Sequence, residues 1–205
     1  MKQFRITFFI AFIFLATISK AQQQRLNLAL NYNTATPVSS SFKNYISKTS
    51  FRGFQGSVLY NINTSLRVGL QVSWNDLYEK YGRQVYKNED GSDISAVLSN
   101  TMQYTPVLVK AEYSFVKEGW LQPYVGAGAG ISLINFEQYI GEFLYRQSYA
   151  KAAFSADLGV LIPFTKGSPY GCRISTSYNL SPFNKEGIKT INTWDVQAGV
   201  VIPLK

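Results

Sequence analysis

The sequence predicts an all-β fold, namely an eight-stranded antiparallel up-and-down transmembrane β-barrel preceded by a cleavable signal peptide. Three features of the 205-residue chain indicate this fold. An apolar stretch typical of a secretory signal comes first, apolar and polar residues then alternate, and short turns alternate with long connections. Alternation with a period of two is typical of strands whose faces meet different surroundings, because successive side chains point to opposite faces of a sheet.

Residues 1–21 have the three parts of a signal peptide. Lys2 and Arg5 give a positive start, residues 6–18 are almost wholly apolar, and residues 19–21 end in alanine, as a signal peptidase requires. A membrane-spanning helix is the alternative, but about thirteen apolar residues fall short of the roughly 20 that a span needs. We therefore expect cleavage after residue 21 and an outer membrane β-barrel domain over residues 22–205.

The composition of the mature chain limits its partners. The signal holds three of the 20 basic residues and none of the 12 acidic ones, which leaves 17 basic against 12 acidic residues and a net charge of +5. Because this moderate excess contains no run of Lys or Arg, nucleic acid is not an expected partner. The length suits one domain. Cys172 is the only cysteine, so an internal disulfide is excluded.

Eight alternating segments follow the signal. In the clearest, 66–75, apolar residues at even positions alternate with polar or small residues at odd positions. The predicted strands are 25–33, 54–61, 66–75, 102–115, 121–133, 151–162, 172–180 and 193–204.

The connections alternate in length. Short turns are expected at 61–64, 116–119 and 163–170, and long loops at 34–50, 76–101, 135–148 and 181–190. Short turns at one rim and long loops at the other are typical of a transmembrane barrel. A soluble exported lipocalin-like barrel would instead place its apolar stripe inside, around a ligand.

Two observations favour lipid on the apolar side. The polar faces carry glycine and serine as well as charges, as expected where eight strands leave a narrow interior. Aromatic residues also collect near both ends of the apolar stripes, which resembles the interfacial girdles of membrane barrels, although strands favour aromatic residues in any setting. The predicted girdles are Tyr60, Tyr113, Phe115, Phe164 and Tyr170 at the short-turn rim, and Phe54, Trp74, Tyr104, Tyr178 and Trp194 at the long-loop rim.

Seven charged residues fall on the predicted inner face. They are Arg67, Lys110, Glu112, Lys151, Asp157, Arg173 and Asp195. Because charges in a narrow barrel must be paired or hydrated, we expect Arg67 near Glu112 and Arg173 near Asp157. A paired cluster would plug the lumen, whereas an open pathway would use the surplus positive charge to favour anions.

The sequence predicts no catalytic, cofactor-binding or metal-binding residue. It contains no histidine, so the usual general base at neutral pH is missing. The glycines of 126–130 lie within an alternating strand, which is the wrong context for a phosphate-binding loop. The oxygen-rich segment 88–93 does not have the spacing of an EF-hand loop. Cys172 is expected to face lipid.

Two stretches resemble a known family. Pro106–Phe115, a turn and then Gln122–Gly130 resemble the central hairpin of the OmpA/OmpW-like small outer membrane β-barrel proteins, a porin-like domain. The last strand resembles the signal read by the barrel-assembly machinery, although the chain ends in Lys205 rather than an aromatic residue. The residues that carry this signal are Gln197, Gly199, Ile202 and Leu204. The resemblance implies a location in the outer membrane, among its lipids.

The expected function is that of a non-enzymatic integral outer membrane barrel with a structural, surface-binding or small-solute role. Its long loops would offer a surface to a protein partner. One alternative is a barrel subunit of a multi-protein envelope or secretion complex, and a second is the soluble lipocalin-like binding barrel.

Overall fold

The computed structural model describes residues 26–87, 93–116, 119–166, 168, 170–185 and 187–204. The predicted signal peptide, most of the oxygen-rich segment 88–93 and Lys205 lie outside the described residues. No helix in the described part is long and apolar enough to cross a membrane.

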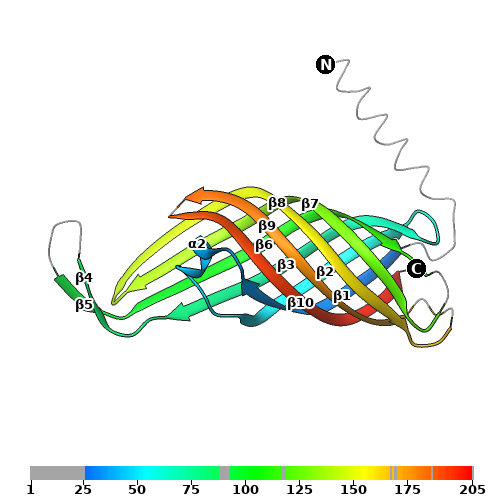
Figure 1. Ribbon diagram of the computed structural model, residues 1–205, viewed down its shortest axis with the longest axis horizontal. Coiled ribbons are helices and arrows are strands. Elements are labelled where there is room, and N and C mark those ends of the chain that lie inside the picture. The colour runs from blue at the N-terminus through cyan, green and yellow to red at the C-terminus, as the bar shows by residue number, and fades with distance from the viewer. Residues whose placement is uncertain are drawn as a thin grey trace, which may run out of the picture.

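Eight antiparallel strands close into a barrel, as predicted (Figure 1). The strands are β1 (Leu26–Pro37), β2 (Ser50–Asn61), β3 (Leu66–Lys80), β6 (Leu98–Ser114), β7 (Gln122–Ile140), β8 (Phe143–Pro163), β9 (Gly171–Lys185) and β10 (Ile188–Leu204). Neighbours in sequence pair with each other, and β10 pairs with β1 from Leu26↔Leu204 to Pro37↔Thr193 to close the ring. Closure gives each wall strand two neighbours, which satisfies backbone groups that lipid cannot.

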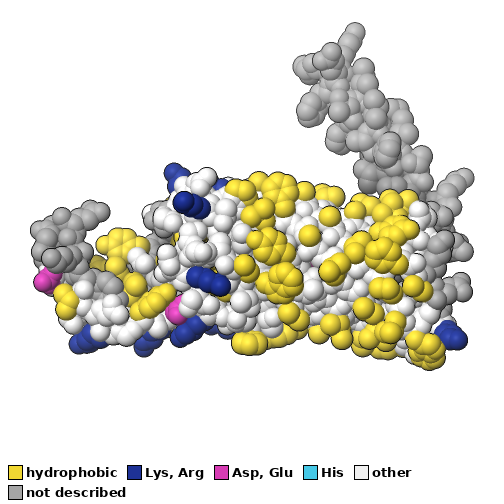
Figure 2. All heavy atoms as spheres, viewed as in Figure 1, with side chains coloured by type: hydrophobic (Ala, Val, Ile, Leu, Met, Phe, Trp, Pro, Cys, Tyr) yellow, Lys and Arg dark blue, Asp and Glu magenta, His cyan; other side chains and the backbone are white. Residues whose placement is uncertain are grey.

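The wall is apolar outside and polar inside. Outward side chains such as Leu70, Val109 and Leu158 are exposed, whereas inward side chains such as Gln71 and Lys110 are buried. Figure 2 shows hydrophobic side chains along the barrel wall, with Lys and Arg gathered toward the end that carries the long connections. This distribution is the reverse of that in a lipocalin-like barrel and argues against that alternative.

The strands are longer at one end than the sequence indicates. The predicted loop 135–148 is mostly strand, because β7 and β8 stay paired up to Ile140↔Phe143 and turn at Gly141, whose φ of 62° suits glycine. The predicted loop 76–101 contains the ends of β3 and β6 and a separate hairpin, β4 (Gln84–Lys87) with β5 (Asp93–Ala96). Strands β3, β6, β7 and β8 therefore project past the rest of the barrel at its loop-side end (Figure 1). The opposite end is called the short-turn end.

The first long connection folds over the loop-side mouth. After β1, a one-turn helix α2 (Ser40–Lys43) packs against β10, where the Ser39 hydroxyl donates a hydrogen bond to the Thr190 carbonyl at 2.7 Å. The side chains of Phe42 and Ile46 have no exposed surface. This connection therefore adds apolar side chains to the barrel interior.

The aromatic rims agree with the prediction except at one residue. Tyr113 and Phe115 at the short-turn rim, and Trp74 and Trp194 at the other rim, are exposed on the outer wall. The placement of Tyr104 in the outer girdle is wrong, since it is fully buried and its hydroxyl lies 2.8 Å from that of Ser181. The physical reason is parity, because Tyr104 is an even-numbered residue of β6 and shares the inner face with Lys110 and Glu112.

Gly199 makes close packing possible at the seam between β10 and β1. A Cβ at this position would overlap the carbonyl oxygen of Leu30 on β1. We expect Gly199→Ala to lower the free energy of unfolding by about 1–3 kcal/mol, as overpacking does, measured by urea unfolding of the purified barrel in lipid vesicles with tryptophan fluorescence. Gly56→Ala is the matched control, since a Cβ at Gly56 would meet only Leu30 Cδ2 at 3.8 Å. Equal midpoints for the two variants would contradict the close approach.

Candidate functional site

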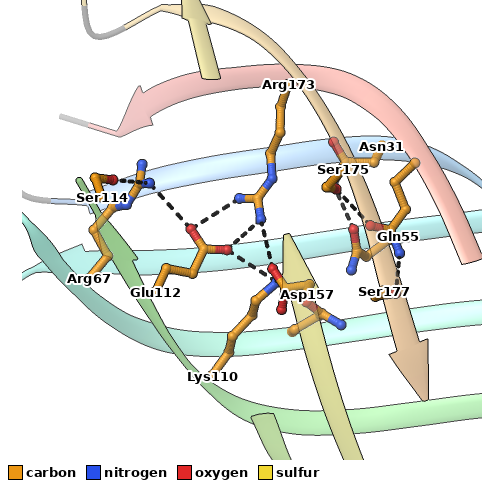
Figure 3. A network of polar contacts seen from close by, with 12 residues as sticks. Asn31, Gln55, Arg67, Lys110, Glu112, Ser114, Asp157, Arg173, Ser175 and Ser177 are labelled. Atoms are coloured by element: carbon orange, nitrogen blue, oxygen red, sulfur yellow. Dashed lines mark hydrogen bonds and ion pairs between the residues drawn. The ribbon is translucent and has the colours of Figure 1, made fainter. Parts of the chain in front are cut away.

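Five of the seven inward charges meet at one level of the lumen (Figure 3). Glu112 on β6 forms ion pairs with Arg67 at 3.5 Å, with Lys110 at 3.1 Å and with Arg173. Asp157 on β8 lies 3.0 Å from Lys110 and 3.8 Å from Arg173. The charge cluster of these five residues therefore joins β3, β6, β8 and β9 across the barrel interior.

The strand register explains which of these contacts sequence reasoning could find. Arg67 and Glu112 are direct partners in the β3–β6 pair, so their contact follows from the pairing of neighbouring strands. The two strands that carry Glu112 and Arg173 are separated by β7 and β8. Their contact appears only when the sheet closes, so the sequence does not predict it. The sequence does predict the approach of Arg173 to Asp157, which lie 3.8 Å apart.

Gly126 makes room for one member of the charge cluster. It is the direct partner of Asp157 in the β7–β8 pair, and a Cβ at Gly126 would lie 2.7 Å from both carboxylate oxygens of Asp157. The neighbouring Gly128 similarly makes room for the hydroxyl of Ser155, at 2.7 Å from the Cβ position. The glycine run on β7 thus creates space on a crowded inner face.

Tyr124 falls on the predicted inner face of β7, but its contact with two arginines is not predicted from the sequence. The guanidinium of Arg173 lies 4.3 Å from the centre of its ring, and that of Arg67 lies 5.7 Å away. Both distances allow cation–π attraction. The available signal was its position as a large side chain directly before the glycines of the β7 inner face, Gly126, Gly128 and Gly130.

Burial makes pairing within the charge cluster essential. The Glu112 side chain is 0% exposed, that of Lys110 2% and that of Arg173 3%. Three cations meet two carboxylates, and the Lys110 ammonium also donates to Gln71 Oε1 at 2.8 Å. Because an unpaired charge at such a site is strongly destabilising, each cation has a carboxylate within ion-pair distance.

Amides form the next level toward the loop-side end. Asp195 faces inward but lies outside the charge cluster, and its Oδ2 accepts hydrogen bonds from Asn33 at 3.0 Å and Asn179 at 2.9 Å. Asn33 also donates to Asn75 at 2.6 Å. The structure therefore surrounds this carboxylate with neutral donors rather than with cations.

The residues of the predicted assembly signal take two kinds of position. Gln197 points inward, where it donates to Ser177 at 2.7 Å and accepts from Ser175 at 2.7 Å. Ile202 and Leu204 face outward, with 37% and 36% of their surfaces exposed. Recognition of these residues by the assembly machinery stays a prediction.

An apolar plug closes the interior at the loop-side end. Phe136 on β7 stacks on Phe183 on β9, with ring centres 5.2 Å apart, and Tyr45 from the first connection lies 5.1 Å from Phe136. Lys151 lies at this level rather than in the charge cluster, with its ammonium 5.7 Å from the Phe183 ring. The buried members of the plug are Phe42, Ile46, Leu77, Met102, Tyr104, Ile134, Phe136, Phe183, Ile188 and Ile191.

The described side chains present no group of three or more Cys, Asp or Glu residues that could hold a metal ion. Cys172 is an even-numbered residue of β9, a set whose side chains face outward, and it is partly exposed. The charge cluster, the amides around Asp195 and the apolar plug therefore fill the lumen and join strands across it.

Glu112 is the residue whose loss tests the charge cluster most directly. Glu112→Gln keeps the size of the side chain but leaves three buried cations with Asp157 alone, and we expect a loss of about 3–5 kcal/mol in the free energy of unfolding. Glu137→Gln is the control. Its ion-pair partner Arg146 lies 2.8 Å away and has a side chain that is 62% exposed. An exposed pair contributes about 0–1 kcal/mol. Urea unfolding in vesicles measures both, and similar losses would contradict the central role of Glu112.

Comparison with known proteins gives a consistent result at the level of fold. A family model described as outer membrane protein β-barrel domain matches residues 7–201. Comparison with curated protein sequences finds no match.

Among solved structures, Neisserial surface protein A is 18% identical with a TM-score of 0.57, over 87% of this chain and 97% of that one. The N-terminal β-barrel domain of Pseudomonas aeruginosa OprF is 16% identical with a TM-score of 0.44, over 85% and 95%. The outer membrane protease OmpT from Escherichia coli is 10% identical with a TM-score of 0.47, over 88% and 97%. Because the family model spans nearly the whole described barrel, the chain belongs to the outer membrane protein β-barrel domain family, and its barrel lies in the outer membrane.

Proposed function

We propose that this protein is a non-conducting, non-enzymatic outer membrane barrel that stabilises the membrane surface and presents a binding sheet outside it. The observation that carries the proposal is a lumen filled at successive levels. The charge cluster lies toward the short-turn end, the amides around Asp195 come next, and the apolar plug with Phe42 lies at the loop-side end. A solute would have to displace all of them.

The projecting part of the sheet supports a role at the surface. β3, β6, β7 and β8 continue past the rest of the barrel, and exposed aromatic residues such as Phe143 and Tyr145 lie on the projecting hairpin. Exposed aromatic residues on a rigid sheet are typical of surfaces that bind other molecules. The partners that we propose are outer membrane lipid around the apolar wall and a protein at the projecting sheet.

The chemistry of the lumen favours a non-enzymatic role. The chain has no histidine, and the carboxylates of the lumen are committed to cations or amides. The protease among the similar structures is only 10% identical to this chain. That likeness shows the fold alone.

Ion conductance tests the filled lumen. We expect the purified protein in a planar lipid bilayer to give no stable openings, because the side chains of the charge cluster are almost fully buried. Phe42→Ser with Ile46→Ser should also stay closed, since it loosens only the apolar plug. A general-diffusion porin reconstituted in the same way is the positive control. Stable, anion-selective openings of the unchanged protein would overturn the proposal.

Export through the inner membrane is part of the same proposal. We expect the protein isolated from outer membranes to begin at Gln22, because a signal peptidase would cut after Ala21. N-terminal sequencing of the membrane fraction measures this, and electrophoresis with and without boiling reports the folded barrel. A protein that keeps Lys2 and Arg5 and stays in the soluble fraction would contradict export.

A further inference from the structure

A hollow interrupts the apolar outer wall where β8, β9 and β10 lie side by side (Figure 1). It has a volume of about 380 Å³, and its surface is almost wholly apolar. The outward side chains that line it are Val125, Ala156, Leu158, Thr176, Tyr178 and Trp194. The hollow therefore lies on the side of the wall that faces lipid.

Small side chains on neighbouring strands create the hollow. Ala156 on β8 is directly paired with Tyr178, and Thr176 on β9 is directly paired with Leu158, so each small side chain lies beside a large one. The Thr176 hydroxyl donates a hydrogen bond to the backbone carbonyl oxygen of Asp195 at 3.0 Å, so its hydrogen is used within the wall. The floor of the hollow is therefore low and apolar, and its sides are bulky.

The hollow lies just below the outer surface of the membrane. Phe154↔Leu180 is the last β8–β9 pair at the loop-side end, and Ala156↔Tyr178 is two residues further along each strand toward the short turns. Tyr178 and Trp194 belong to the aromatic rim that marks the membrane interface. Because the long loops of a transmembrane barrel lie outside the cell, the hollow opens to the outer leaflet.

One polar group lies at the upper end of the hollow. The side-chain amide of Asn192 donates a hydrogen bond to the Tyr178 hydroxyl oxygen at 2.8 Å. That bond leaves the hydrogen of the hydroxyl for an acceptor in the interface, where tyrosine rings place their polar ends at the level of the headgroups. The carbonyl oxygens that join acyl chains to the rest of a lipid lie at the same level. An acyl chain in the hollow would bring its carbonyl to this donor.

The surroundings favour a hydrocarbon chain as the occupant. An apolar cavity does not hold water, and an empty one costs its lining the contacts of a filled site. A second copy of the chain would bring a broad wall, and Phe154, Leu158 and Trp194 project around the hollow with 47%, 58% and 49% of their surfaces exposed. These side chains keep a broad surface away from the floor, whereas a flexible chain passes between them.

We infer that this hollow binds one acyl chain of an outer-leaflet lipid in preference to the rest of the wall. The inference rests on the lipid that is proposed above as a partner, and it gives that lipid a defined place on β8, β9 and β10. Contacts with the bulky sides supply the affinity, and the Tyr178 hydroxyl binds the carbonyl at the end of the chain.

Tryptophan fluorescence tests the inference, because Trp194 lines the hollow and reports on its contents. One variant keeps Trp194 alone, through Trp74→Phe and Trp120→Phe. A second variant keeps Trp74 alone, which is exposed on the outer wall at the same rim but does not line the hollow. Each is folded in dodecyl maltoside micelles and titrated with a phosphatidylcholine whose chains carry bromine near the carbonyl end, since bromine quenches tryptophan on contact.

We expect half-maximal quenching of Trp194 at a mole fraction of the lipid about three- to tenfold lower than for Trp74. The maltoside chain has no carbonyl for the Tyr178 hydroxyl, and one hydrogen bond accounts for a preference of this size. Equal midpoints for the two tryptophans would overturn the inference. Weaker quenching of Trp194 than of Trp74 at every mole fraction would also overturn it, because a second copy would then cover the hollow.

A filling variant tests the place of the chain. Ala156→Leu puts a larger side chain on the floor of the hollow and should abolish the lower midpoint of Trp194. Ala198→Leu makes the same change at an outward position of β10 that does not line the hollow, and should keep it. Electrophoresis with and without boiling checks that both variants fold. The same midpoint in the two variants would contradict the site.

A hydroxyl variant tests the carbonyl end of the site without a change in its shape. Tyr178→Phe keeps the ring and should raise the midpoint of Trp194 to that of Trp74. Tyr113→Phe is the control, since Tyr113 is exposed on the outer wall at the opposite rim. An unchanged midpoint in Tyr178→Phe would overturn the role of the hydroxyl.

The conductance experiment fails independently of this one. A protein that conducts ions and still shows the lower midpoint of Trp194 would overturn the filled lumen and support the chain site. A closed protein with equal midpoints would do the reverse.

Discussion

The structure depends on one constraint, which is that lipid cannot accept or donate hydrogen bonds to the backbone. Closure of the sheet through the β10–β1 pair meets this constraint within the wall. It also divides the side chains, because alternation then places one set against lipid and the other in a narrow interior. Polar residues on the inner set therefore pair largely with one another. The charge cluster and the amides around Asp195 are the consequence.

The charge cluster shows how a narrow interior can hold charges. Glu112 lies against three cations that come from β3, β6 and β9, and Asp157 completes the set from β8. Removal from water penalises each of these ions, so a cluster of this kind is stable only when every member is paired. Gly126 contributes by its lack of a side chain, since Asp157 occupies the space that a Cβ would need. A small residue on one strand therefore makes room for a charged residue on the inner face of the next strand.

The sequence predicted what depends on alternation and missed what depends on closure. Eight strands and the inward facing of Arg67 and Glu112 follow from the period of two and the pairing of neighbours. The contact between Glu112 and Arg173 and the position of Tyr124 against Arg173 join strands that are not neighbours, so they require the closed ring. The ends of β7 and β8 lie in the segment 135–148, which the sequence predicts as a loop. Both faces of that hairpin meet water, so alternation is lost while pairing continues.

The same constraint explains where the sheet opens. Within lipid a strand must be paired on both sides, but outside it water satisfies the backbone. The last β8–β9 pair at the loop-side end is Phe154↔Leu180, and residues 143–153 of β8 continue past it with β7 as their one paired strand. Tyr178 on β9 and Trp194 on β10 are direct partners, and their ring centres are 6.4 Å apart. Both lie on the outer wall just below the Phe154↔Leu180 pair, toward the short-turn end. Aromatic residues of this kind mark the membrane interface. β8 therefore loses its second neighbour where the wall leaves the lipid, and from there on water satisfies the backbone groups on its free side.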